Sequence, residues 1–216
     1  MAAQIHSWRR FYSMKIVIVD YGMGNIRSIT STLKYLGIEE VVISSNFEDL
    51  KSADKLILPG VGAFNKAMKQ IEAQKLDLSL QQLVLNEKKP VLGICLGMQL
   101  MGISSTEDGL NDGLKFVDAD VRIFENKDLK IPHVGFNQVH FNTKSRLFDG
   151  LLDYSDFYFT HSYKMESKNE INQSYCNYGN DFIASFEVEN IAGVQFHPEL
   201  SQNNGIKLLD NFIKNF

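Results

Sequence analysis

The sequence predicts an α/β fold: an open, mostly parallel twisted sheet with helices on both faces and added antiparallel strands. From Met14 to about Gly109, short β-branched runs alternate with helical patterns, which is typical of βαβ units and a parallel sheet. After Gly109, short alternating segments are separated by Gly, Asn and Asp turns. This second sequence pattern indicates antiparallel or mixed strands added to the parallel core.

The first half begins with KIVIVD at 15–20, which has the composition of a buried strand. A helix over 25–36 follows, with Asn25 as its N-cap and Gly37 as its C-terminal stop. Further strands are predicted over 41–44, 55–59 and 90–94, and further helices over 63–74, 76–87 and from Leu96 onward.

The second half contains short strand-like segments over 115–124, 138–142, 157–165, 174–178, 182–188 and 191–196. A final helix begins near Ser201, because apolar residues then recur at helical spacing up to Phe216. Since no internal repeat or Pro-rich linker interrupts the chain, residues 14–216 are predicted to form one domain.

Residues 1–13 (MAAQIHSWRRFYS) are predicted to be a flexible N-terminal extension. The segment lacks the apolar core of about 7–15 residues that a secretory signal needs. Its arginines and aromatic residues leave open a second interpretation, a docking arm.

Composition excludes several classes of function. The net charge of −4 and the absence of a Lys/Arg run argue against nucleic-acid and anionic-membrane binding. The two cysteines, Cys95 and Cys176, form no CxxC, which argues against a disulfide framework and a zinc ribbon. No apolar stretch approaches the ~18 residues of a membrane span. We therefore expect a cytoplasmic protein.

A cysteine framed by two glycines lies between a predicted strand and a predicted helix, in Gly93-Ile94-Cys95-Leu96-Gly97. This is the G-x-nucleophile-x-G elbow with Cys in place of Ser. The sharp turn strains the backbone of the central residue, and the glycines remove collisions between side chains. At a helix N-terminus, free N–H groups and the helix dipole favour the thiolate. Cys95 is therefore the candidate nucleophile, although free cysteines are often simply buried.

The candidate base is His197, in the motif QFHPE at 195–199. Side chains two positions apart in extended chain point the same way, so Glu199 can reach the imidazole. A carboxylate on one ring nitrogen fixes the tautomer and leaves the other nitrogen to take a thiol proton. The same motif taken alone also fits a surface turn. It offers too few ligands for a metal site, and none is predicted.

Two glycine-rich loops follow predicted strands. PGVG at 59–62 either presents N–H groups to a developing oxyanion or is an ordinary strand–helix turn. Gly22 and Gly24 follow the first strand, but Arg27 stands where a dinucleotide fingerprint has Gly. A Walker motif is also absent, so no nucleotide cofactor is predicted.

Taken together, PGVGAF at 59–64, GICLGMQ at 93–99, THSY at 160–163 and QFHPE at 195–199 resemble the class I glutamine amidotransferases. DYGMGN at 20–25 and PHVGFNQV at 132–139 narrow the resemblance to the glutaminase subunits of imidazole glycerol phosphate synthases. The resemblance runs in order from Lys15 to Phe216. It implies the flavodoxin-like fold of that class.

The resemblance implies glutamine hydrolysis without a cofactor. Cys95 would attack the side-chain amide of glutamine, giving a glutamyl thioester and releasing ammonia. His197, oriented by Glu199, would take the thiol proton, protonate the leaving amine and then activate water.

The resemblance also implies further roles, and the Leu96 N–H at the predicted helix start independently suits an oxyanion. The oxyanion hole would form from backbone that reorients before it donates, which would link activity to the partner's state. Its residues would be Gly60, Val61, Gly62 and Leu96. The glutamine-holding positions would be Gln99, His161, Ser162 and Tyr163, together with Gly62.

The implied partner is a (β/α)₈-barrel synthase subunit that forms a heterodimer with this chain. In the barrel, ammonia would convert a phosphoribulosyl-formimino intermediate into imidazole glycerol phosphate and an aminoimidazole carboxamide ribotide. The residues from Met14 onward leave no room for a barrel of about 250 residues. The surface facing the synthase would include Asn25, Phe136, Asn137 and Leu200.

Two positions depart from the family pattern. Phe136 replaces the Trp of the usual PHMGWN motif, and Leu200 replaces the Lys that usually follows the triad glutamate. Histidine biosynthesis is the leading prediction. One alternative is a paralogue that supplies another barrel enzyme, such as one installing an amidino group on a surface-polysaccharide sugar. The others are a stand-alone cysteine hydrolase and a catalytically idle scaffold protein.

Overall fold

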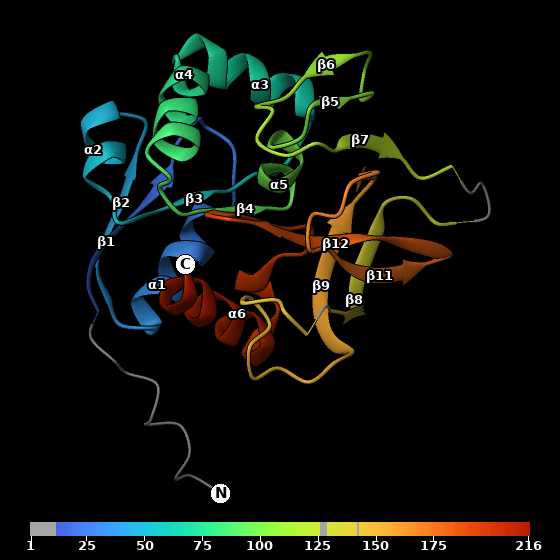
Figure 1. The fold of residues 1–216 in the computed structure, drawn as a ribbon. Helices are drawn as coiled ribbons and strands as arrows, with labels where there is room; N and C mark the ends of the chain where they lie inside the picture. The colour runs from blue at the N-terminus through green and yellow to red at the C-terminus, as the bar shows by residue number, and fades with distance from the viewer. Residues whose placement is uncertain (1–11, 126–128, 142) are drawn as a thin grey trace, which may run out of the picture.

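A central parallel sheet organises the computed structural model, which describes residues 12–125, 129–141 and 143–216 (Figure 1). Its strand order is β2-β1-β3-β4-β13, and each neighbouring pair is parallel. This is the flavodoxin-like arrangement of a doubly wound sheet. The strands are β1 (Tyr12–Val19), β2 (Ile38–Ser44), β3 (Lys55–Leu58), β4 (Val91–Ile94) and β13 (Ile191–Val194).

Helices cover both faces of this sheet, as predicted (Figure 1). Successive residues of β1 serve the two layers in turn: Ile16 and Ile18 pack into one core, Val17 and Val19 into the other. The first core includes α1 (Ile26–Tyr35) and α6 (Gln202–Asn215). The second includes α2 (Phe47–Ser52), α3 (Phe64–Ala73), α4 (Leu76–Leu80) and α5 (Leu96–Leu100).

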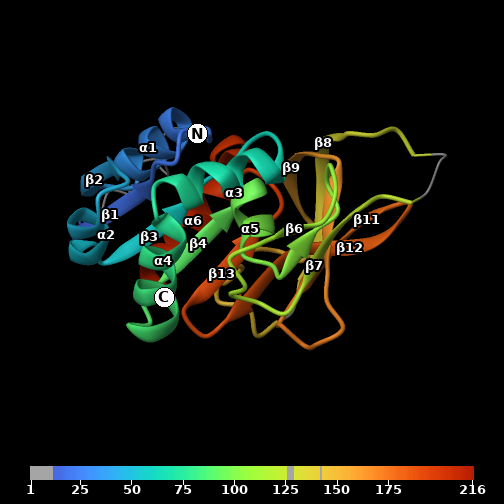
Figure 2. The ribbon, with the colours of Figure 1, turned by 90° about the horizontal axis from the view of Figure 1, so that it is seen from above.

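The second half adds antiparallel strands at one side of the parallel core, which confirms the predicted mixed sheet (Figure 2). β12 (Asn180–Val188) pairs antiparallel with β13. The sheet then continues through β10 (Tyr163–Glu166), β7 (Asp120–Ile123), β5 (Ser104–Ser105) and β6 (Asn111–Asp112). A branch from β12 holds β11 (Ser174–Tyr178), β8 (His133–His140) and β9 (Ser155–His161).

Several predicted elements differ from the observed ones. The segment 157–165 is two strands, because the chain turns at Ser162 so that β9 pairs with β8 and β10 with β7 and β12. Of the predicted strand over 115–124, only β7 is observed. Its predicted first residue, Lys115, has a positive φ of 61°, which a strand does not allow. The helix over 76–87 is α4 continued by a π-helix, η1 (Gln81–Asn86). The short helix α2 was not predicted, although Asn46 caps it by accepting from Glu48 N.

The ends of two predicted elements need correction. β1 begins two residues before Met14, because Tyr12 pairs with Ile38; the remaining extension, 1–11, lies outside the described residues. Asn25 stands at the N-cap of α1, but its side chain makes no capping bond and donates instead to Glu199. No helix among the described residues is long and apolar enough to cross a membrane.

The turn from β4 into α5 allows a test of the two glycines that flank Cys95, Gly93 and Gly97. A Cβ atom on Gly97 would lie 1.8 Å from the Leu58 carbonyl oxygen, so Gly97→Ala forces α5 away from β3. We expect the free energy of unfolding to fall by about 3 kcal/mol or more, measured by urea denaturation.

The control is Gly150→Ala. Gly150 has a positive φ (72°), but its nearest neighbour is the flexible end of Lys207 at 3.3 Å. This change should cost only about 1 kcal/mol. Equal losses in the two variants would contradict the collision at Gly97.

Candidate active site

Cys95 sits at a strained turn between β4 and α5. Its φ and ψ are 53° and −110°, a conformation that few residues other than glycine adopt. A Cβ on Gly93 would lie 2.8 Å from the Gly97 carbonyl oxygen and the Met98 backbone. Gly93 and Gly97 are therefore required by close backbone approach, as the elbow motif predicted. The turn places the thiol at the carboxyl end of β4.

His197 and Glu199 follow β13, the strand beside β4. Glu199 Oε1 lies 2.8 Å from His197 Nδ1, and the same oxygen accepts from Asn25 Nδ2 at 3.1 Å. The main-chain N–H of His197 donates to the Tyr158 carbonyl at 2.8 Å, which fixes the histidine against β9. With Nδ1 held by the carboxylate, Nε2 is the nitrogen left to receive a proton.

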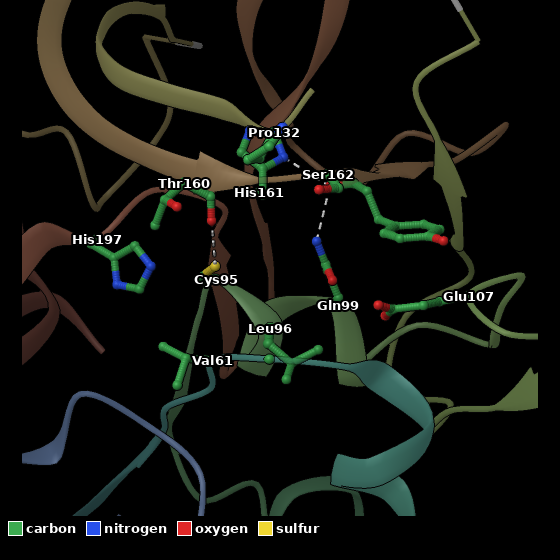
Figure 3. Close-up of a pocket in the computed structure, with 12 residues that line it drawn as sticks. Val61, Cys95, Leu96, Gln99, Glu107, Pro132, Thr160, His161, Ser162 and His197 are labelled. Carbon is green, nitrogen blue, oxygen red and sulfur yellow. Dashed lines mark hydrogen bonds between the residues drawn. The ribbon is translucent and has the colours of Figure 1, made fainter. Parts of the chain in front are cut away.

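The electrostatics of the pair favour an imidazolium beside Cys95. Burial disfavours the charged ring, but the interactions with Cys95 and Glu199 outweigh it and raise the pKa of His197 to about 10. The Cys95 thiol itself points at the Thr160 carbonyl, 3.8 Å from Sγ. Figure 3 shows the imidazole and the sulfur facing each other across the pocket. A proton leaving the thiol therefore has an acceptor beside it.

One pocket of about 250 Å³ surrounds the sulfur (Figure 3). It is smaller than the ~300 Å³ at which pockets for drug-sized ligands begin, so it fits a small metabolite. Of the predicted site residues, its lining includes Val61, Gly62, Cys95, Leu96, Gln99, His161, Ser162, Tyr163 and His197. Gly60 does not line it and packs against the backbone of Gly97.

The predicted partner-facing residues occupy different environments. Phe136 and Leu200 are 50% and 41% exposed. Asn137 is on the opposite face of β8 from Phe136 and donates to the Asn177 carbonyl at 2.9 Å. Asn25 is bonded to Glu199.

Sequence reasoning missed Glu107, Pro132, Thr160 and Gln195 at this site. Glu107 lines the pocket on the side away from His197 (Figure 3), where it accepts from the Phe64 N–H at 2.8 Å. Burial raises the pKa of its carboxyl, partly offset by that hydrogen bond. Thr160 accepts from the thiol through its carbonyl. Gln195, one residue beyond β13, contacts the sulfur with Nε2 3.6 Å from Sγ.

Among the described residues, no group of three or more His, Cys, Asp or Glu side chains could hold a metal ion. Cys176 is free and buried, and burial raises the pKa of its thiol to about 12. It lies in β11, away from the elbow.

Two buried histidines are hydrogen-bonded to each other, and one of them, His161, lines the pocket. His161 Nδ1 lies 2.8 Å from the Tyr163 carbonyl, which can only accept, so Nδ1 carries the proton. His161 Nε2 then accepts from His133 Nδ1 at 3.0 Å. Burial lowers the pKa of His133 to about 4 and is the main cause that lowers that of His161 to about 3. Both rings are therefore neutral near pH 7.

The family model for glutamine amidotransferase class-I matches residues 17–216. The chain belongs to this family. Subunit HisH 2 of imidazole glycerol phosphate synthase from Vibrio vulnificus (strain YJ016) is 45% identical over 93% of this chain and 94% of that protein. Subunit HisH of the same enzyme from Aquifex aeolicus (strain VF5) is 42% identical over 92% and 96%. This glutamine amidotransferase is thus of the HisH type, which confirms the narrower resemblance.

Solved structures agree on the fold. A glutamine amidotransferase from Thermotoga maritima superposes with a TM-score of 0.61 at 15% identity, covering 94% of this chain and 83% of that one. PurLQS from the same organism gives 0.69 at 16% identity, covering 93% of this chain and 97% of that one. The predicted α/β fold of the class is confirmed.

The buried histidine pair predicts a loss of stability in mild acid. Between about pH 6.5 and 4 the unfolded chain binds a proton at His133 that the folded chain does not, so stability falls as pH falls. Lowering the pH from 6.5 to 5 should cost about 2 kcal/mol at this site. His133→Asn keeps a donor near the Nδ1 position but cannot titrate. It should lose about 2 kcal/mol less than wild type over this range.

Urea denaturation at pH 6.5 and pH 5 measures both losses. Parallel losses in wild type and His133→Asn would show that His133 is not held neutral in the folded state.

Proposed function

We propose that this glutamine amidotransferase is the glutaminase subunit of an imidazole glycerol phosphate synthase. It hydrolyses glutamine to glutamate and ammonia, and a (β/α)₈-barrel subunit uses the ammonia in histidine biosynthesis. The observation that carries the proposal is Cys95 on a strained elbow, facing a histidine whose far nitrogen is held by Glu199. The relatives' names supply the enzyme to which this chemistry belongs.

The reaction follows from this geometry. The Cys95 thiolate attacks the side-chain carbonyl carbon of glutamine, and the proton passes to His197 Nε2. The tetrahedral intermediate collapses as the imidazolium protonates the leaving nitrogen, which departs as ammonia. Neutral His197 then takes a proton from water, whose oxygen attacks the thioester. Collapse of the second intermediate releases glutamate and restores the thiol.

The oxyanion of both intermediates needs donors beside Sγ. The Leu96 N–H belongs to the first turn of α5 and so has no acceptor within its own helix. Val61 and Gly62 line the same pocket, and we assign their backbone to the oxyanion hole. Gly60, which the resemblance adds to this set, lies outside the pocket lining and contributes only the peptide that it shares with Val61. The positive φ of Gly62, 101°, fits a loop whose peptides can reorient.

The far end of the pocket suits the amino-acid end of glutamine. Glu107 places a carboxylate where the α-ammonium would lie. Both hydrogens of Gln99 Nε2 are already used, by the Tyr163 carbonyl and by Gln195 Oε1. Gln99 can therefore only accept from substrate, through Oε1, which again suits an ammonium. His161, Ser162 and Tyr163 also line the pocket.

The partner surface in this proposal lies around Phe136 and Leu200. Asn25 and Asn137, which the resemblance also assigns to this surface, are bonded to Glu199 and to the Asn177 carbonyl. The exposed apolar side chains of the surface include Val134, which is 57% exposed and points the same way as Phe136 along β8. Exposed apolar residues grouped beside a catalytic site indicate a docking surface. Because Leu200 follows Glu199 directly, a barrel docked here would touch the segment that holds the base.

The deciding experiment is a glutaminase assay with and without the barrel subunit of the histidine pathway and its nucleotide substrate. We expect the barrel to stimulate glutamate release about 5- to 150-fold, which is the factor that corresponds to typical coupling free energies between two sites. Cys95→Ala should lower turnover on the order of 10⁴-fold or more.

Two variants with matched charge serve as controls for docking. Phe136→Asp should weaken binding of the barrel, whereas Leu78→Asp, at an exposed leucine of α4, should not. Full activity without any partner would refute the proposal. Stimulation by a different barrel protein would favour the paralogue.

Glu107→Gln tests the substrate assignment. Removing the charge that meets the α-ammonium should raise KM for glutamine about 10- to 100-fold, the worth of a hydrogen bond to a charged group. The kcat value should change little, because Glu107 is remote from the reacting carbonyl. The control is Asp108→Asn, at a neighbouring residue outside the pocket lining. An unchanged KM in Glu107→Gln would overturn the assignment.

A further inference from the structure

Gln195 is a fully buried carboxamide in contact with the reacting sulfur. It follows the last residue of β13, with no exposed surface, and its main-chain N–H donates to the Ala184 carbonyl at 2.8 Å. The side chain extends toward Cys95, where Nε2 lies 3.6 Å from Sγ. A buried amide with a fixed backbone has little freedom to turn away.

The direction of this amide is set by a chain of hydrogen bonds. The Tyr163 carbonyl can only accept, so the atom of Gln99 at 3.0 Å from it must be the nitrogen. The second hydrogen of that nitrogen points to Gln195 at 2.8 Å, so the atom there must be the oxygen. The nitrogen of Gln195 is therefore the atom that faces Cys95.

We propose that Gln195 is a catalytic residue that donates Nε2–H to the Cys95 thiolate, increasing its population and aiming its sulfur. The inference rests on the proposed function, in which Cys95 is the nucleophile. A hydrogen bond strengthens when its acceptor becomes charged, so this contact favours the thiolate over the thiol. When the thiol loses its proton it also loses its bond to the Thr160 carbonyl, and the Gln195 donor is already in place.

The ionisable groups around Cys95 leave room for a neutral donor. His197 faces the sulfur from the segment after β13, and its proton comes from the thiol itself. Tyr21, from the segment after β1, is buried with a raised pKa and donates to the Pro59 carbonyl at 2.6 Å. His161 is neutral, since its pKa is about 3. Gln195 alone among these four groups holds a donor on the sulfur at every pH.

The test measures the reactivity of Cys95 without glutamine or partner. The full chain is alkylated with iodoacetamide between pH 5 and 10, and the rate at each pH reports the thiolate fraction. Cys95→Ala provides the blank, and buried Cys176, with a thiol pKa of about 12, stays silent.

Removing the donor should slow this reaction. Gln195→Leu should reduce the alkylation rate at pH 7 about tenfold and move the midpoint of the pH profile up by about one unit. Gln195→Glu has the same shape but presents oxygen in place of the donor, so its midpoint should rise further.

Asn211→Leu is the matched control. Asn211 is also a buried carboxamide, and its Nδ2 donates to the Leu147 and Asp149 carbonyls away from the site. Its removal leaves two carbonyls without a donor but should leave the alkylation profile as in wild type. A wild-type profile in Gln195→Leu, or an equal shift in Asn211→Leu, would overturn the proposal.

A second measurement needs no change at Gln195 and decides the question should the variants fail to fold. In the wild-type chain, the side-chain NH₂ signals of Gln195 in a ¹⁵N spectrum should shift with the same pH midpoint as alkylation. The shift should disappear in Cys95→Ala. Signals that stay constant through that midpoint would refute the hydrogen bond.

These outcomes separate the inference from the proposed function. Alkylation that depends on Gln195 in a chain without partner-stimulated glutaminase activity would refute the proposed function but keep the hydrogen bond from Gln195 to the Cys95 thiolate. Stimulated activity with alkylation independent of Gln195 would do the reverse.

Discussion

The close approach of α5 to β3, at the turn that carries Cys95, is the constraint on which the rest of the structure depends. Gly97 lies directly against the Leu58 carbonyl, and only a residue without Cβ fits there. The strained conformation of Cys95 costs about 1–3 kcal/mol and persists because two cores hold the turn from both sides. In return, the sulfur stands at the carboxyl ends of β3, β4 and β13, where three loops meet. The candidate base and the proposed oxyanion donors lie around that point.

Patterns within short stretches of sequence were sufficient to predict how the candidate nucleophile and the candidate base are arranged. The glycine frame identified Cys95, and the alternation of side chains in extended chain joined His197 to Glu199, which the structure places 2.8 Å apart. The same rule, taken two residues upstream, puts Gln195 on this face as well, so its contact with the sulfur could have been predicted. The roles in substrate and partner binding came from family resemblance, and they remain proposals.

Other features could not be predicted from short sequence patterns, because contacts between distant parts of the chain determine them. Glu107 enters the pocket from the loop between β5 and β6, whose strands are two residues each. Asn25 has the sequence position of a helix cap, but a carboxylate from a distant segment takes its amide. The break at Ser162 arises because β9 and β10 pair with different neighbours, which a continuous apolar run does not reveal.

The position of β13 gives the chain an order of assembly. This strand lies between β4 and β12 in the middle of the sheet, yet it is nearly the last to be synthesised. Until it emerges from the ribosome, the elbow cysteine has no base and β4 has an unpaired edge. A chain that ends before β13 therefore contains Cys95 without the strand that positions His197. One strand thus completes the central sheet and brings His197 to Cys95, so a partly synthesised chain lacks the arrangement on which the proposed reaction depends.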